Sequence, residues 1–142
     1  MKDMLNMENL KNIFKDYPYI ACAYLFGSQA SGKTGPMSDV DIAVLLKEPY
    51  PKGRDLIHKM DYLAYKMETV LKREVDIVEM NKQGLIFQYN VLRTGKLIYD
   101  ADPDFRIRFV AKAISDYCDF EPTLRFMNNY YFEGYRRRLS KL

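Results

Sequence analysis

The sequence predicts an α/β (α+β) fold, a small mixed β-sheet flanked by helices, with a C-terminal helical segment. Short apolar segments rich in β-branched residues alternate with segments of helical periodicity. The length, 142 residues, is typical of one domain, and 48% of the residues are hydrophobic, enough for a substantial core. We therefore expect one domain over residues 1–142, with a core of about 1–100 and a helical region of about 103–142.

The first half of the chain contains a predicted helix, two buried strands and a longer helix. Apolar residues at helical spacing predict the first helix over about 3–15. The apolar segments 19–27 and 40–46, bounded by prolines and glycines, are typical of buried strands. A clear three-four pattern then predicts a helix over about 54–72.

The second half predicts two more strands and two more helices. The alternating segment 73–80 indicates a strand, 83–93 a short helix and 96–100 a brief fourth strand. A last helix begins at Asp102-Pro103, because proline suits a first turn. Pro122 should kink or restart this helix.

Composition excludes several classes of protein. The net charge of +3 is too small to indicate a nucleic-acid-binding protein, so direct nucleic-acid binding is not expected. Two cysteines indicate neither a disulfide framework nor a zinc site. The N-terminus resembles neither a signal peptide nor a membrane span, which favours a cytoplasmic protein without a membrane partner.

Two aspartates open the second strand. Because alternate side chains of a strand share a face, Asp39 and Asp41 point to one side and Val40 and Ile42 to the other. Carboxylates at this spacing repel unless cations neutralise them, and carboxylate oxygens are ligands that Mg²⁺ prefers. The alternative is that the two aspartates only cap a turn or a strand end.

A glycine- and serine-rich loop precedes these aspartates. After the tight turn at Gly27, backbone amides and the Ser28 hydroxyl can face an anion such as phosphate. The alternative is a plain surface turn, and the spacing is not that of a P-loop. Ser38 has a local capping or hydrogen-bonding role as its simplest explanation.

A third acidic residue, Asp76, lies between Val75 and Ile77 in the third strand. A charge among β-branched residues is costly unless it is paired. If this strand neighbours the second one, Asp76 can approach the same metal site. Alternatively, Asp76 lies on the exposed face of an edge strand or pairs with Lys72 or Arg73.

Together these residues resemble the DNA polymerase β-type nucleotidyltransferase superfamily. Its motif is Gly-Ser, a short loop and Asp-x-Asp, with a third aspartate on a later strand, as in Gly27-Ser28, Asp39-x-Asp41 and Asp76. The short chain is similar to the minimal nucleotidyltransferases. The segment FGSQASGKTGPMSDVDIAVLL, the later DYCDFEP and the Tyr/Arg-rich end most resemble the MntA-type antitoxin branch.

The resemblance implies the nucleotidyltransferase fold and a Mg²⁺-dependent transfer of AMP from ATP. It implies that Asp39 and Asp41 bind two Mg²⁺ ions, that Asp76 completes the catalytic site, and that Gly27 and Ser28 hold the terminal phosphates. Members of this branch adenylylate a tyrosine of a partner HEPN ribonuclease toxin and silence it. Many relatives carry an arginine where this chain has residues 29–31, so triphosphate binding falls to Lys33 or to a basic residue elsewhere.

Two other functions stay open at this point. The chain could modify a small alcohol of the aminoglycoside kind, although it is short for a dedicated small-acceptor pocket. It could instead be a non-catalytic toxin-binding module with a vestigial nucleotide site, which the three acidic residues argue against. Assembly as a homo-oligomer or as a hetero-oligomer with the toxin is equally open.

Overall fold

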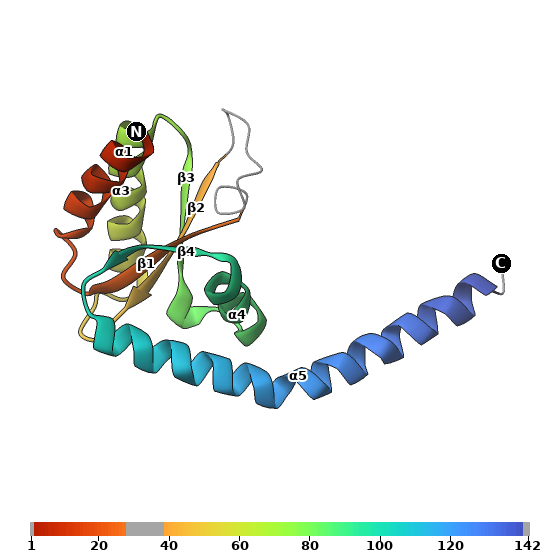
Figure 1. The fold of residues 1–142 in the computed structure, drawn as a ribbon. Coiled ribbons are helices and arrows are strands. Elements are labelled where there is room, and N and C mark those ends of the chain that lie inside the picture. The colour runs from red at the N-terminus through yellow and green to blue at the C-terminus, as the bar shows by residue number, and fades with distance from the viewer. Residues whose placement is uncertain (1, 28–38, 141–142) are drawn as a thin grey trace.

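The protein forms a four-stranded mixed sheet with helices on both faces (Figure 1). The computed structural model describes residues 2–27 and 39–140. The strand order is β3-β2-β1-β4; β1 is antiparallel to β2 and β4, whereas β2 and β3 are parallel. The strands are β1 (Ile20–Phe26), β2 (Val40–Leu46), β3 (Val75–Glu79) and β4 (Lys96–Asp100).

The helices follow the predicted order along the chain. They are α1 (Lys2–Phe14), α3 (Gly53–Leu71), a short 3₁₀ helix (Met80–Lys82), α4 (Leu85–Thr94) and α5 (Pro103–Ser140). The strand predicted over 73–80 is shorter than expected. It ends at Glu79 because the buried Met80 starts the 3₁₀ turn, which leads the chain towards α4.

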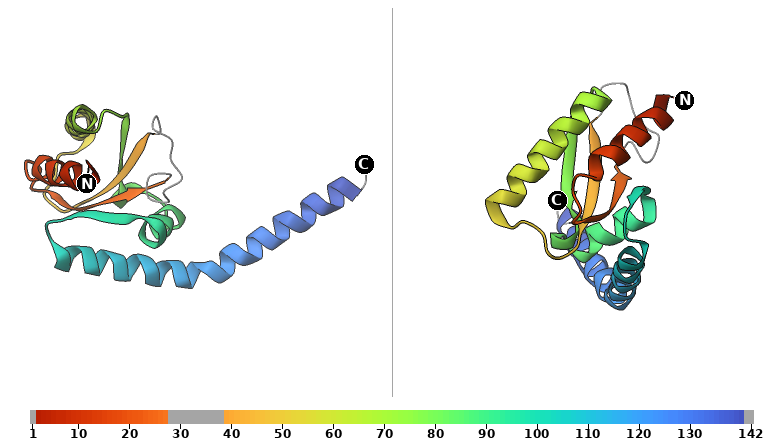
Figure 2. Two further views of the ribbon diagram at one scale, coloured as in Figure 1. Left: turned by 45° about the horizontal axis from the view of Figure 1, so that its top comes forward. Right: turned by 90° about the vertical axis from the view of Figure 1, so that its left-hand side faces the viewer.

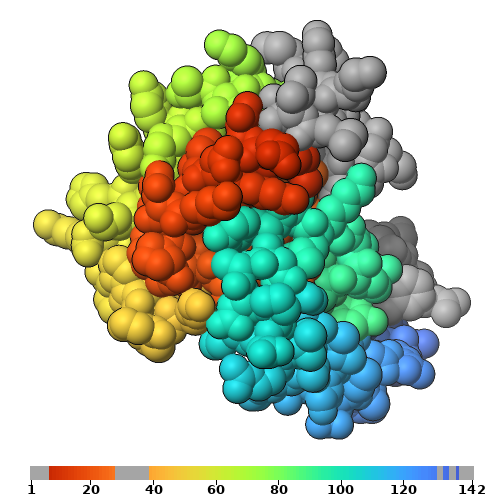
Figure 3. Space-filling model, turned by 60° about the vertical axis from the view of Figure 1, so that its left-hand side comes forward, coloured from red at the N-terminus to blue at the C-terminus, as the bar shows by residue number. Residues whose placement is uncertain are grey.

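Two hydrophobic clusters separate the faces of the sheet. Ile42 and Val44 of β2 belong to the cluster that includes residues of α1 and α3. Ala43 and Leu45 belong to the cluster on the side of α4 and α5, with the buried Cys22. Figure 2 shows the two helical layers, and Figure 3 shows α1 lying between α3 and the β4–α5 segment. The alternation predicted for β2 is therefore confirmed.

Helix α5 packs on the body through side chains of its first half. Phe105 and Phe109 pack against the second cluster, and the ring of Tyr117 stacks on that of Tyr89 in α4, with ring centroids 3.7 Å apart. The helix does not restart at Pro122 but runs through it and changes direction part-way along (Figure 1). Proline removes one backbone hydrogen bond, which bends a helix whose other bonds persist.

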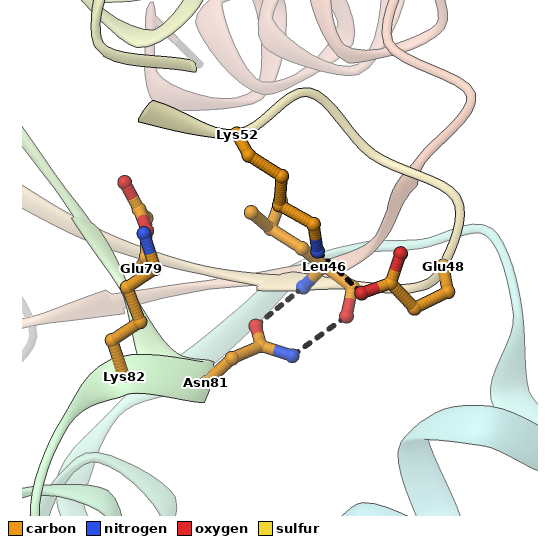
Figure 4. A network of polar contacts seen from close by, with 6 residues as sticks. All are labelled: Leu46, Glu48, Lys52, Glu79, Asn81 and Lys82. Atoms are coloured by element: carbon orange, nitrogen blue, oxygen red, sulfur yellow. Dashed lines mark hydrogen bonds and ion pairs between the residues drawn. The ribbon is translucent and has the colours of Figure 1, made fainter. Parts of the chain in front are cut away.

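The side chain of Asn81 extends the sheet beyond the end of β3. It accepts a hydrogen bond from the backbone N–H of Leu46 (2.8 Å) and donates one to the carbonyl of Leu46 (2.7 Å) (Figure 4). Asn81 therefore occupies the place that a backbone amide of a longer β3 would take. Nearby, Gln88 donates a hydrogen bond to the carbonyl of Met80 and ties the 3₁₀ turn to α4.

We expect Asn81→Ala to destabilise the fold by about 1–3 kcal/mol, because it leaves a partly buried N–H and C=O of Leu46 without partners. Urea denaturation of the purified protein measures this loss. Asn90→Ala is the matched control, since Asn90 is exposed on α4. An equal loss in both variants would contradict the assigned role of Asn81.

Candidate active site

Strand pairing brings Asp41 and Asp76 together. The parallel register of β2 and β3 places Asp76 directly beside Asp41. Neighbouring strands lie about 4.8 Å apart, and register partners share a face of the sheet. Both side chains therefore start from the face that carries Ala43 and Leu45, on the side of α4 and α5.

Asp39 lies immediately before β2 and joins these two residues in an acidic cluster, defined as Asp39, Asp41 and Asp76. Asp39 and Asp76 are exposed, whereas Asp41 is half-buried. Burial raises the pKa of the Asp41 carboxyl, and the charges of Asp76 and then Asp39 raise it further. The three carboxylates are thus close enough to repel one another through partly buried space.

No basic side chain among the described residues neutralises the acidic cluster through an ion pair. Asp76 forms no ion pair with any described residue, so the expected alternative of pairing with Lys72 or Arg73 is not seen. The other alternative placed Asp76 on the exposed face of an edge strand, and β3 is indeed an edge strand. The same strand also places Asp76 beside Asp41. A divalent cation at this edge would relieve the repulsion that raises the Asp41 pKa.

The donor chemistry of the cluster suits Mg²⁺. Within residues 2–27 and 39–140, no group of three acidic, histidine or cysteine side chains is placed to hold a metal ion by itself. Magnesium does not require such a group, because it usually takes one or two carboxylates and fills its octahedron with water and substrate phosphate. Side-by-side carboxylates at an exposed sheet edge fit that mode of binding.

Gly27 closes the cluster from the end of β1. Its φ is +74°, a left-handed conformation that glycine adopts without strain. A Cβ at this position would lie 2.6 Å from Oδ2 of Asp41, well inside van der Waals contact. Glycine is therefore required at position 27 for two reasons: the turn has a positive φ, and the Asp41 carboxylate occupies the space where a Cβ would lie. Three further residues of the predicted nucleotide site, Ser28, Lys33 and the locally hydrogen-bonding Ser38, lie outside the described residues.

An aromatic wall beside the cluster was missed by the sequence analysis. Phe26 is the antiparallel register partner of Asp41, on the same face of the sheet. Its ring packs edge-on against that of Phe87 in α4, with ring centroids 5.4 Å apart. The sequence contained a signal for this residue, because Phe26 directly precedes Gly27. Only the pairing of β1 with β2, however, places Phe26 next to Asp41. The two rings form an apolar surface on the face of the sheet that also carries Asp41.

Comparison with known proteins agrees with this arrangement. Residues 8–104 match the family described as "Polymerase beta, Nucleotidyltransferase". The chain belongs to the polymerase β-type nucleotidyltransferase family. The matched residues include β1 to β4 and so contain Gly27 and the whole acidic cluster of this nucleotidyltransferase.

Curated relatives identify the branch. The chain is 31% identical over 114 residues to the protein adenylyltransferase MntA of Shewanella oneidensis, covering 80% of this chain and 78% of the relative. It is 32% identical over 94 residues to an MntA of Aphanizomenon flos-aquae, covering 61% of each. The nucleotidyltransferase is thus an enzyme of the MntA protein adenylyltransferase branch, as the motif resemblance implied.

Solved structures share the fold. A crystal structure of a toxin-antitoxin with AMP-PNP superposes with a TM-score of 0.73 at 25% identity, over 89% of this chain and 98% of that one. The MNT antitoxin in complex with a tri-AMPylated HEPN toxin of Shewanella oneidensis gives 0.69 at 24% identity, over 93% and 99%. The predicted fold class is confirmed. In the described ranges, no helix of the nucleotidyltransferase has the length and apolarity to cross a bilayer.

Proposed function

We propose that this nucleotidyltransferase transfers AMP from ATP to a tyrosine hydroxyl of a partner HEPN-type ribonuclease toxin and acts as its antitoxin in the cytoplasm. The observation that carries the proposal is the register pairing of Asp41 with Asp76 beside Gly27. The 31%-identical relative is named a protein adenylyltransferase, and the neighbour at 25% identity is a toxin-antitoxin crystallised with AMP-PNP. Both support a protein acceptor over a small alcohol.

In this proposal Asp39, Asp41 and Asp76 hold two Mg²⁺ ions. When bound, the ions would neutralise charge on the α-phosphate and lower the pKa of the acceptor hydroxyl. Burial, Asp76 and Asp39 together raise the pKa of the Asp41 carboxyl, which supports this assignment, because cations at the cluster would offset these effects.

The remaining roles follow from positions around the cluster. Gly27 and Ser28 would receive the β- and γ-phosphates, with Lys33 offsetting their charge and Ser38 hydrogen-bonding locally. The tyrosine oxygen would attack the α-phosphorus in line, the bond to the bridging oxygen of the β-phosphate would break, and pyrophosphate would leave. Asp76, exposed at the sheet edge, would accept the tyrosine proton at a carboxylate oxygen.

The test is AMP transfer to a defined partner. The full chain is incubated with ATP, Mg²⁺ and a HEPN protein encoded by an adjacent gene, and intact masses are measured. We expect a gain of one AMP per modified tyrosine, abolished by EDTA. Asp39→Ala should slow the transfer about a thousandfold, the scale for removing one group that stabilises transition-state charge.

Two outcomes would reject the proposal. Binding of the toxin without any gain in mass would favour the non-catalytic module. Transfer of AMP to an aminoglycoside alcohol but not to the HEPN protein would favour the small-molecule enzyme. Asp61→Asn, on the exposed side of α3, serves as the control that leaves transfer unchanged.

A further inference from the structure

Two tyrosines of α3 present their hydroxyls to solvent. Among the tyrosine side chains that the structure describes, the exposed ones are Tyr62, Tyr65 and Tyr130, at 60%, 64% and 70%. Tyr130 already interacts with another residue of the chain. No hydrogen bond with a described residue occupies the hydroxyl of Tyr62 or Tyr65. These two hydroxyls are therefore available as acceptors in a protein whose proposed reaction consumes a tyrosine hydroxyl.

The neighbours of Tyr62 along α3 are basic. Lys59, three residues before it, and Lys66, four residues after it, share its side of the helix. The Lys66 ammonium lies 4.8 Å from the centroid of the Tyr62 ring, and 3.9 Å from the Asp16 carboxylate. Lys59 is exposed and forms no ion pair with any described residue. Tyr62 therefore lies where a polyphosphate or an acidic site would be attracted.

Tyr65 has acidic neighbours instead. Asp61, four residues before it, and Glu68, three residues after it, share its side of the helix. Their charges disfavour the approach of a polyphosphate. The rings of Tyr62 and Tyr65 stack, with centroids 6.4 Å apart and planes 18° from parallel. Tyr65 thus offers an aromatic surface beside Tyr62 on which a nucleobase can stack.

We propose that the nucleotidyltransferase also adenylylates its own chain at Tyr62, with one copy modifying another. The inference rests on the proposed function, because it uses the same ATP site and the same acceptor chemistry. The phenol oxygen of Tyr62 bonds to the α-phosphorus of ATP, and the bond from that phosphorus to the bridging oxygen breaks. Pyrophosphate leaves with the electron pair, and the phenol proton passes to Asp76 of the copy that holds ATP.

The fold places Tyr62 away from the acidic cluster of its own chain. Helix α3 buries Leu63 and Met67 in the hydrophobic cluster on the α1 side of the sheet. Asp41 and Asp76 start from the opposite face, on the side of α4 (Figure 2). The sheet therefore separates Tyr62 from its own site, whereas a second folded copy can present it from solvent. The rate of self-modification should then rise with the square of the protein concentration.

A catalytically impaired acceptor tests transfer between copies. Asp39→Ala is incubated with the wild type, ATP and Mg²⁺, without toxin, and intact masses distinguish the two chains. We expect one AMP on Asp39→Ala only when the wild type is present, and none on the double variant D39A/Y62F. The matched control D39A/Y65F keeps the ring at position 65, loses only its hydroxyl and should gain as much AMP as Asp39→Ala.

A charge reversal tests the role of the basic neighbours. In the acceptor, Lys59→Glu should slow the gain of AMP about tenfold, because it replaces attraction to the acidic site and the polyphosphate with repulsion. In the enzyme, Tyr62→Phe should leave AMP transfer to the HEPN protein unchanged, since Tyr62 lies on the other side of the sheet from the acidic cluster.

Parallel reactions with the HEPN protein separate this inference from the proposed function. AMP on the HEPN protein with none on Asp39→Ala overturns self-modification and leaves the proposed function standing. Undiminished AMP on D39A/Y62F, or an equal loss in D39A/Y65F, overturns the assignment of Tyr62. The absence of AMP from both proteins overturns the proposed function and this inference together.

Discussion

Asp41→Asn is expected to abolish AMP transfer while making the metal-free protein slightly more stable. The substitution removes the half-buried charge that faces Asp76 and Asp39, and with it a metal ligand. Removing repulsion between partly exposed charges contributes about 0.2–1 kcal/mol. For a chain of this size that corresponds to about 1–3 °C in Tm. Thermal melts without Mg²⁺ and transfer assays on the same preparations measure both effects.

The difference in Tm between Asp41→Asn and the wild type should change with pH in one direction. The folded-state pKa of Asp41 is raised, so the protonated carboxyl stabilises the fold at low pH, and this stability is lost as pH rises through that pKa. The Tm advantage of Asp41→Asn should therefore be largest at neutral pH and vanish in acid. Mg²⁺ should raise the Tm of the wild type and not that of the variant.

The control and the contradicting result are equally specific. Asp61→Asn changes an exposed aspartate of α3 and should shift neither Tm nor transfer. If Asp41→Asn retained wild-type turnover, or lost stability at neutral pH, Asp41 would be a structural residue and the acidic cluster would not be the metal site.

Gly27→Ala is expected to lower AMP transfer about a hundredfold, the loss that a displacement of about 1 Å causes in a positioned catalytic group. The added Cβ would lie 2.6 Å from Oδ2 of Asp41, so the carboxylate must move. The positive φ of +74° adds about 1–2 kcal/mol of backbone strain for any residue with a Cβ. Steady-state transfer rates and chemical denaturation measure the two losses.

Gly53 offers a matched control for this substitution. It also has a positive φ, +61°, but nothing lies within 4 Å of the Cβ that alanine would add. Gly53→Ala should therefore lose a similar amount of stability and keep its activity. Equal losses of activity in the two variants would mean that strain alone, and not the displaced Asp41 carboxylate, causes the effect.

Local patterns were sufficient for most of the secondary structure. The segments VDIAVLL and KLIYD are strands with the predicted bounds, because each is a short apolar run between strong breakers. The alternation along β2 also predicted which side chains share a face of the sheet. Pro122 was harder to interpret, since a proline can end a helix or only bend it, and that depends on the rest of the helix.

The sequence by itself determined the elements, their order, the family motif and the position of Asp39 and Asp41 at the start of a strand. These features depend on residues that are close together in the chain, because helical and strand periodicity and turn-forming residues are local properties of the sequence. Only the tertiary structure decided that β3 lies beside β2, so that Asp76 meets Asp41, and that β1 brings Phe26 and Gly27 against the same carboxylate. The physical reason is that strand order and register arise from packing between distant segments, which no local pattern encodes.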